Sequence, residues 1–337
     1  MKWKVLLVLV FAVSMVLAAC GSSSTSLVQT EQSGNSQKEA SASTEKKLRI
    51  AYVPGMTIDP FYISMKFGAE EMAKKLGVEL IWTGSPEWDY AKQSPIVDSL
   101  VAEKVDAIII TPTDEKAMVA PLKRAKQAGI PVFTVDTNVS DDSVYVANVT
   151  ADNVQGGMLG ADTLAKLIGE SGKVLVIGTK PGITTGDERE KGFKEQIKKY
   201  PNIQIIATEY TDDQIAVSAK KTADVLLAHP DLAGIFVGSG LSGTGVAQTL
   251  RVQNLQNKVK LISYDAGPDQ VKALKAGEMQ ALISQKPLEE ARSVMQMAVD
   301  YIQGKKDMKK LTVLDNVSVT VENVDKPEVQ QWLYRSE

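Results

Sequence analysis

Short apolar runs recur along the chain from Leu48 onward. Most of them are apolar throughout rather than alternating with polar residues, which indicates strands buried on both faces. The runs that predict strands are Leu48–Val53, Val78–Trp82, Ala107–Thr111, Val132–Val135, Lys173–Gly178, Ile203–Ala207, Ile235–Gly238, Lys260–Ser263 and Gln280–Ile283.

Segments with helical spacing of apolar residues lie between these runs. They are Tyr62–Leu76, Ser94–Glu103, Glu115–Gln127, Gln155–Leu167, Glu188–Lys199, Ala216–Leu227, Gly243–Leu250 and Asp269–Lys275. Gly129 and Gly277 each follow a basic last turn, so we expect both to be C′ glycines. The alternation of strand and helix predicts an α/β protein with parallel sheets covered by helices on both faces. Roughly 240 residues of alternating strands and helices are more than one sheet usually accommodates, which favours two similar doubly wound lobes.

The stretch LRIAYVPGMTIDPFY joins the first predicted strand to the first helix. It turns through Pro54 and Gly55 and brings Asp59, Phe61 and Tyr62 to the point where the helix begins. In open parallel sheets, small ligands bind at the carboxyl ends of the strands. A carboxylate and two aromatic rings are therefore expected at that edge.

Polar and aromatic side chains follow most of the other strands as well. Those at or just past a strand end include Thr111, Asp136, Thr137, Arg189, Ser239, Tyr264, Asp265 and Gln285. If two lobes face each other along these edges, the groups line one cleft between the lobes.

Composition excludes several classes of function. The 337 residues are 44% hydrophobic and 23% charged with a net charge of −3, and no Lys/Arg-rich run stands out, which argues against nucleic acid as a partner. One His and one Cys cannot assemble a zinc cluster. The stretch Gly238–Gly243 resembles a nucleophile elbow but has no plausible histidine partner. We therefore expect no enzyme activity, no cofactor and no metal.

The N-terminal region predicts export. Lys2 and Lys4 precede the apolar core Val5–Val16, which is short for a membrane span, and the following LAACG resembles the lipobox of bacterial lipoproteins. That resemblance implies a signal peptide over residues 1–19, cleavage before Cys20 and diacylation of Cys20. Residues 20–47, rich in Ser and polar groups, are predicted to be a flexible tether. We expect an extracytoplasmic lipoprotein, on a Gram-positive surface rather than in a periplasm.

Several segments together resemble the periplasmic sugar-binding proteins of the ribose-binding type, whose fold is shared with the lactose-repressor family. The resemblance covers nearly all of Leu48–Val321. It rests on IDPFY, IIITPTD, AGIPVFTVD, VTADNVQGG, DEREKGF, LAHPDLAGIFVG, ISYDAGPD and ISQKP. It implies an N-terminal lobe of residues 48–150 plus 286–314, a C-terminal lobe of 151–285 plus 315–337, and a hinge of three crossovers. It also implies a monomer that closes on its ligand and docks on an ABC permease driven by a cytoplasmic ATPase.

Position by position, the resemblance implies a ligand-binding set of carboxylates, aromatic rings, a guanidinium and an amide. The set is Asp59, Phe61, Tyr62, Asp136, Arg189, Tyr264, Asp265 and Gln285. Asp59 stands where that family has an asparagine, and the others match. Such a set suits a polyol, because a carboxylate accepts from two hydroxyls, Arg donates a planar fork, and aromatic faces cover the C–H side of a sugar.

Four other positions depart from the ribose-binding pattern. Thr137 replaces a second arginine, Thr111 and Ser239 replace asparagines, and Asp213 replaces an aromatic residue. Because a site built for one set of hydroxyls discriminates through its polar partners, these changes argue against ribose itself. Trp88, in the loop after the second strand, is a candidate replacement for the lost stacking face.

Three functions remain open from the sequence. The first is capture of a small neutral sugar or polyol for an ABC importer. The second is a receptor for an autoinducer-like furanose, or a sugar receptor coupled to a sensor kinase. The third is binding of a small cation, since three aspartates face a single counter-charge, Arg189, among aromatic rings. A repressor is excluded, because an export signal stands where the DNA-binding head would be.

Overall fold

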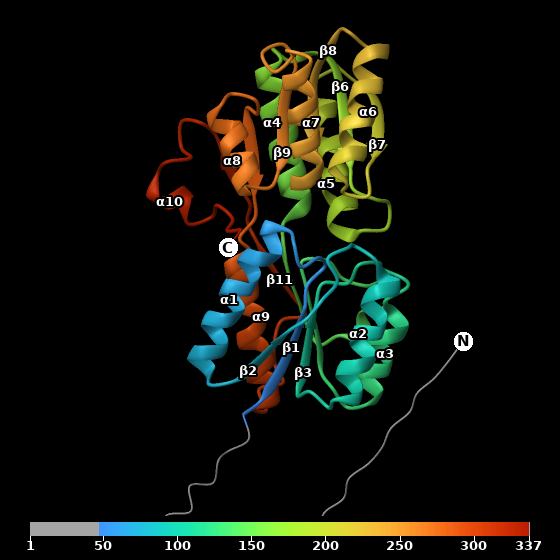
Figure 1. The fold of residues 1–337 in the computed structure, drawn as a ribbon, viewed down its shortest axis with the longest axis vertical. Helices are drawn as coiled ribbons and strands as arrows, with labels where there is room; N and C mark the ends of the chain where they lie inside the picture. The colour runs from blue at the N-terminus through green and yellow to red at the C-terminus, as the bar shows by residue number, and fades with distance from the viewer. Residues whose placement is uncertain (1–46, 337) are drawn as a thin grey trace, which may run out of the picture. The chain divides into compact units, whose positions relative to one another are not determined.

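The computed structural model describes residues 47–336 (Figure 1). The predicted signal peptide, Cys20 and the predicted tether up to residue 46 lie outside the described residues. Within the described part, no helix has the length and apolar character needed to cross a membrane.

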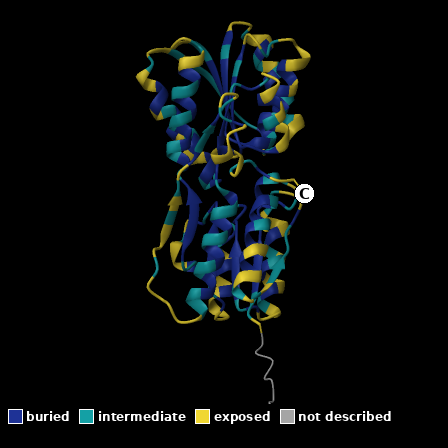
Figure 2. Cartoon of the chain, turned by 90° about the vertical axis from the view of Figure 1, so that its left-hand side faces the viewer, coloured by how far each residue is buried: buried dark blue, intermediate teal, exposed yellow. Residues whose placement is uncertain are grey.

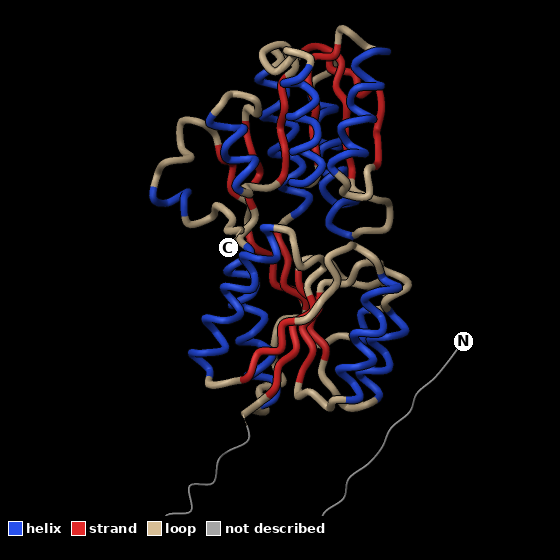
Figure 3. Tube along the Cα trace, viewed as in Figure 1, coloured by secondary structure: helices blue, strands red, loops and turns tan. Residues whose placement is uncertain are grey.

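Two six-stranded sheets organise the described chain, one in each of two lobes (Figure 3). The sheet of the first lobe is parallel throughout and has the order β11-β5-β4-β3-β1-β2. Its strands are β1 (Arg49–Val53), β2 (Glu79–Trp82), β3 (Ala107–Ile110), β4 (Val132–Val135), β5 (Asn148–Ala151) and β11 (Leu311–Leu314).

Helices cover both faces of this sheet. They are α1 (Pro60–Leu76), α2 (Tyr90–Ala102), α3 (Val119–Gln127) and α9 (Pro287–Ile302), with a short 3-10 turn, η1 (Asp142–Val144). Alternate residues of β1 serve the two sides: Ile50 and Tyr52 pack with α1 and α9, whereas Ala51 and Val53 pack with α2 and α3. Residues on both faces of the central strands β1, β3, β4 and β5 are therefore buried, whereas the edge strands β2 and β11 are partly exposed (Figure 2).

The sheet of the second lobe has the order β12-β10-β9-β8-β6-β7, and only β12 runs antiparallel to its neighbour. Its strands are β6 (Ser171–Gly178), β7 (Asn202–Tyr210), β8 (Leu232–Val237), β9 (Lys260–Tyr264), β10 (Ala281–Ser284) and β12 (Val317–Val319). Its helices are α4 (Asn153–Leu167), α5 (Thr184–Gln196), α6 (Ile215–Ala228), α7 (Gly240–Val252), α8 (Pro268–Lys275) and α10 (Pro327–Gln330), with the 3-10 turn η2 (Ile197–Lys199).

The predicted two-lobe α/β fold is confirmed, and the chain passes between the two sheets after β5, after β10 and after β11. Gly129 and Gly277 have φ values of 82° and 74°, as expected of C′ glycines. Three strands, β5, β11 and β12, and two helices, α9 and α10, were not among the predicted elements. The helix predicted to start at Gly243 starts at Gly240, with Ser239 at the N-cap position.

Candidate ligand-binding site

The start of α1 carries the first predicted residues. The Asp59 carboxylate accepts a hydrogen bond from the Phe61 amide at 2.8 Å, and Pro60 occupies the first helical turn. This cap fixes where the helix begins, so Phe61 and Tyr62 are buried at the carboxyl edge of the sheet, 3% exposed each. Asp59 thus has a structural role besides any contact with a ligand.

Tyr62 is tied to Asp136, which follows β4 with a φ of 62°. The Tyr62 hydroxyl donates to Asp136 Oδ2 at 2.7 Å. Burial raises the pKa of Asp136 to about 6, although the nearby Arg189 guanidinium and the Tyr62 hydroxyl favour its ionised form. Tyr62 therefore acts as a hydrogen-bonding partner of the carboxylate as well as an aromatic wall.

Arg189, on α5, is held by neighbours on three sides. Its Nε donates to Asn153 Oδ1 and its Nη1 to the Gly238 carbonyl, both at 2.9 Å. Its guanidinium lies over the Tyr264 ring, 4.1 Å from the centroid. Tyr264 itself is fully buried and is the surface on which Arg189 rests. The guanidinium is thereby fixed before any ligand arrives.

Asp265 lies at the end of β9 beside Gln285. Its Oδ1 accepts from Gln285 Nε2 at 2.8 Å and from the Tyr334 hydroxyl at 2.9 Å. Gln285 Oε1 is buried and has no hydrogen-bond partner among the described residues. Asp265 Oδ2 likewise has no hydrogen bond within the described chain, so an acceptor is left on each side chain.

Asp213 and Ser239 are engaged with each other at the start of α7. The Ser239 hydroxyl donates to Asp213 Oδ1, which also accepts from the Ser242 amide at 3.3 Å and the Ser242 hydroxyl at 3.1 Å. A carboxylate at a helix N-terminus is stabilised by the free amides and the helix dipole. Burial nevertheless raises the pKa of Asp213 above its ordinary value.

The remaining predicted residues, Trp88, Thr111 and Thr137, lie in the segments after β2, β3 and β4. The Thr137 hydroxyl donates to the Pro112 carbonyl at 2.6 Å. Trp88 lies 6.3 Å from the Tyr62 ring, centroid to centroid. Trp88 Nε1 and Thr111 Oγ1 are buried without a hydrogen-bond partner in the described part of the chain. Because buried polar atoms are almost always paired, these two atoms and Gln285 Oε1 are suited to a bound polar ligand.

The charges of the site are unbalanced. The charges of four carboxyl groups repel one another in this region; the groups are Asp59, Asp136, Asp213 and Asp265. The positive charge of Arg189 opposes this repulsion at Asp136 and lowers the pKa of that carboxyl. Burial, followed by the charges of Asp213 and Asp265, raises the pKa of Asp59 well above its ordinary range. No group of His, Cys, Asp or Glu side chains suited to hold a metal ion occurs among residues 47–336.

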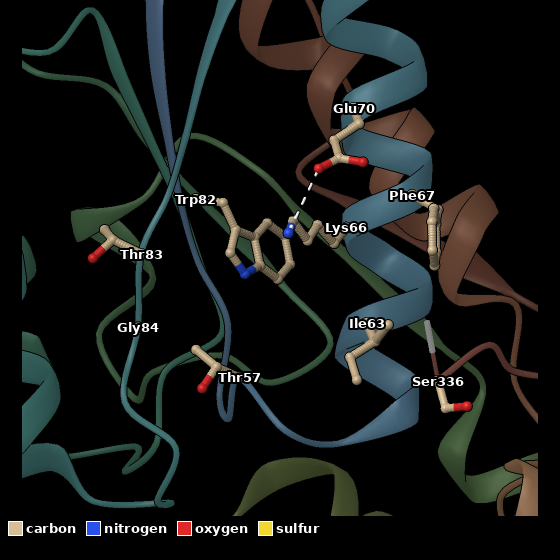
Figure 4. Close-up of a pocket in the computed structure, with 9 residues that line it drawn as sticks. All are labelled: Thr57, Ile63, Lys66, Phe67, Glu70, Trp82, Thr83, Gly84 and Ser336. Atoms are coloured by element: carbon tan, nitrogen blue, oxygen red, sulfur yellow. Dashed lines mark ion pairs between the residues drawn. The ribbon is translucent and has the colours of Figure 1, made fainter.

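Two hollows lie near these residues. Asp59, Asp265 and Tyr334 line a cavity of about 270 Å³ between the start of α1 and the starts of α7 and α8. A larger hollow of about 570 Å³ lies between α1 and the end of β2 (Figure 4). Its lining, which includes Trp82 and the ion pair of Lys66 and Glu70 at 3.7 Å, contains none of the predicted site residues.

Two residues of the site were missed by sequence reasoning. Asn153, which orients Arg189, belongs to the segment VTADNVQGG that supported the family resemblance, so a signal for it was present. Tyr334 lies far past the last predicted strand, in a segment without a periodic pattern, and the sequence gives no sign that it returns to Asp265.

Comparison with known proteins agrees with this architecture. The family described as periplasmic binding protein domain matches residues 50–306. The ribose import binding protein of Salmonella typhimurium is 30% identical over 273 residues, which covers 81% of this chain and 91% of that protein. The D-allose-binding periplasmic protein of Escherichia coli is 29% identical over 250 residues, covering 72% of this chain and 80% of its own.

Two similar solved structures contain bound sugars. A solute-binding protein of an ABC transporter from Agrobacterium vitis, bound with α-D-tagatopyranose, is similar with a TM-score of 0.84 and 35% identity, over 86% of this chain and 100% of that one. A carbohydrate-transporter binding protein from Agrobacterium radiobacter in complex with D-arabinose has a TM-score of 0.82 and 27% identity, again over 86% of this chain and 100% of the other.

Proposed function

Because the chain belongs to the periplasmic binding protein family, we propose that it captures a small neutral sugar or polyol outside the cytoplasm and delivers it to an ABC importer. It is a binding protein and not an enzyme. The proposed lobes are residues 48–150 plus 286–314 and residues 151–285 plus 315–337, which close on the ligand. The relatives supporting this proposal are import and solute-binding proteins.

The observation that carries the proposal is the guanidinium of Arg189, which the protein's own groups hold in place. Arg189 is held by Asn153 and the Gly238 carbonyl, and its charge acts on both Asp136 and Asp265. A planar donor flanked by acceptors matches vicinal hydroxyls, each of which both donates and accepts. Such a preformed arrangement reduces the ordering cost of binding.

The proposed contacts are those of the sequence prediction, with different roles for some members. We assign the ligand-binding set to Asp59, Phe61, Tyr62, Trp88, Thr111, Asp136, Thr137, Arg189, Asp213, Ser239, Tyr264, Asp265 and Gln285. Within it, Tyr264 supports Arg189, and Asp213 with Ser239 forms the polar wall at the start of α7.

The ligand is proposed to be a pentose or hexose other than ribose. The relatives named above bind, by their descriptions, ribose, allose, tagatose and arabinose, so the family accommodates varied stereochemistry. Thr111, Thr137, Asp213 and Ser239 depart from the ribose-binding pattern, and each changes which hydroxyls can be matched.

A small cation is the weaker candidate. The excess of carboxylates favours it, but burial raises the pKa of Asp59, Asp136 and Asp213. Carboxyl groups that hold protons more tightly attract a cation less, and the fixed Arg189 charge repels one. Binding that weakens steeply with added salt would favour the cation.

A thermal-shift panel of pentoses, hexoses, deoxy sugars, alditols, a furanose signal and small amines tests the proposal. A ligand at a hundred times its dissociation constant adds about 2.7 kcal/mol to the free energy of unfolding. For lobes of this size the midpoint is expected to rise by about 5–10 °C. We expect a neutral sugar to give this shift, and Asp136→Ala and Arg189→Ala to abolish it.

Lys173→Ala is the matched control, since its ion pair with Asp231 at 2.8 Å lies at the opposite end of the second lobe's sheet. It should leave the sugar-induced shift unchanged. A panel in which amines shift the midpoint and sugars do not would contradict the proposed ligand class.

We also propose that Cys20 carries a lipid anchor that holds the protein at the outer face of the membrane as a monomer. The lipobox-like sequence supports this. Labelling with a fatty-acid analogue is expected to mark the wild type and not Cys20→Ser, which should be released into the medium. Retention and labelling of Cys20→Ser would refute the anchor. Co-purification with a sensor kinase instead of a permease would favour the receptor alternative.

A further inference from the structure

The C-terminal tail, residues 320–336, lies outside the region matched by the family, which ends at residue 306. It is nonetheless well anchored on the second lobe. Val324 and Val329 are buried in the main apolar cluster, 0% and 6% exposed. The Ser284 hydroxyl donates to the Trp332 carbonyl at 2.7 Å. The tail therefore has a defined path, which returns from α10 to the junction of the two lobes, where Figure 1 marks the C-terminus.

The tail ends by inserting Tyr334 between predicted site residues. The Tyr334 hydroxyl donates to Asp265 Oδ1 and accepts from the Gln285 amide, both at 2.9 Å. Its ring lies 5.6 Å from that of Phe61, and its side chain is 6% exposed. The phenol hydroxyl thus both donates and accepts a hydrogen bond, and these two bonds hold Asp265 and Gln285.

This geometry limits the orientation of Asp265. With Oδ1 taken by Tyr334 and by Gln285 Nε2, the carboxylate cannot rotate without breaking a charge-assisted hydrogen bond, so Oδ2 remains as the acceptor. Tyr334 and Asp265 also line the same cavity of about 270 Å³. Asp265 therefore presents a single acceptor atom, Oδ2, to a ligand hydroxyl in a fixed direction.

The residue after Tyr334 connects the tail to the first lobe. The Arg335 amide donates to the Ser64 hydroxyl on α1 at 2.7 Å, and the Arg335 guanidinium lies 5.2 Å from the Phe67 ring centroid. The Tyr334 amide meanwhile donates to the Ala266 carbonyl, after β9, at 2.9 Å. Two consecutive residues are thus bonded to different lobes.

We propose that the C-terminal tail is part of the sugar site: Tyr334 positions Asp265 and Gln285 for a ligand hydroxyl, and the Arg335–Ser64 contact latches the closed lobes. The inference rests on the proposed function, because it assigns a specificity-determining residue to that site. Tyr334 acts through Asp265 as a positioning residue. The latch lowers the rate of ligand release, since the lobes cannot separate at α1 until this contact breaks.

Tyr334→Phe tests the positioning role because it keeps the ring and removes only the hydroxyl. With a sugar identified by the thermal-shift panel, we expect the dissociation constant to rise roughly tenfold, mostly through faster release, and the ranking of hydroxyl epimers to change. Ser64→Ala removes the latch without touching Asp265. It should speed release about threefold and leave the epimer ranking unchanged.

Tyr200→Phe is the matched control, because the Tyr200 hydroxyl also donates to an aspartate, Asp162 Oδ1 at 2.8 Å, but away from the site. It should change neither affinity nor release. Wild-type affinity, release rate and epimer ranking in Tyr334→Phe would overturn the inference while leaving the proposed function intact.

If no sugar binds the wild type, the proposed function fails, and hydrogen exchange of the ligand-free protein decides the tail's role. The Gln285 amide should then exchange faster in Tyr334→Phe than in wild type or Tyr200→Phe, because it loses its acceptor. Unchanged exchange would overturn the inference.

Discussion

At the scale of single residues, Asp136 gives the site a dependence on pH. Burial raises its pKa to about 6. Ligand hydroxyls that donate to the carboxylate favour its ionised form and lower that pKa in the complex. Affinity is therefore fully present above about pH 6 and is lost as the pH falls through that value, by up to about tenfold per unit. Titration calorimetry from pH 5 to 8 measures this.

The change can be assigned to Asp136 with two variants. Asp136→Asn should bind more weakly and show no inflection near pH 6. Asp265→Asn should also bind more weakly but keep the inflection, because Asp136 is intact. An inflection that survives in Asp136→Asn would mean that another group titrates there.

Local patterns predicted Asp136 and Asp265 as candidate ligand-binding residues, because each lies at the end of an apolar run typical of a buried strand. The same patterns did not reveal what each side chain contacts. Tyr264 follows such a run too, yet its ring lies under Arg189 because Gly156, without a side chain, leaves room for the phenol: a Cβ there would lie 1.7 Å from the Tyr264 hydroxyl.

At the scale of elements, the close packing of α4 on α5 positions Arg189. A Cβ on Gly157 would lie 2.1 Å from the Arg189 carbonyl oxygen. Gly157→Ala must therefore push α5 away from α4, where Asn153 holds the guanidinium. We expect a loss of about 1–3 kcal/mol in the free energy of unfolding and a loss of sugar affinity of roughly tenfold, since small displacements of positioning groups are costly.

Gly234→Ala separates these effects, because a Cβ there would meet the Leu164 side chain at 2.8 Å, between β8 and α4 rather than between α4 and α5. It should lower stability similarly in urea unfolding while leaving affinity close to wild type. Equal affinity losses in both variants would show that the packing of α4 on α5 has no specific part in placing Arg189.

Most elements with a clear apolar pattern were predicted, but α9 was missed although Ala291, Val294, Met295 and Ala298 give it a helical apolar face. β5 and β12 are short, with polar residues at two of four positions in β5 and one of three in β12, so they lack an apolar run. The tail was missed for another reason: Val324 and Val329 are buried by residues distant in sequence, which no local pattern reports.

At the scale of the whole molecule, the proposed site takes side chains from both lobes. Asp59, Tyr62 and Asp136 come from the first lobe, and Arg189 and Asp265 from the second. The backbone amide of Asn138 donates across to the Thr184 hydroxyl at 3.3 Å, and the tail adds the Arg335 contact with Ser64. A ligand that bonds to site residues of both lobes would stabilise the closed arrangement of the lobes, which an importer can then recognise.

Calorimetric titration of the protein with D-tagatose, D-arabinose, D-allose and D-ribose, at low and high salt, tests this account most directly. It predicts that one neutral sugar binds saturably at about one per chain, that salt changes its affinity little, and that Arg189→Ala and Asp136→Ala remove the binding heat. Absence of heat from every sugar, or binding that persists unchanged in both variants, would contradict the account.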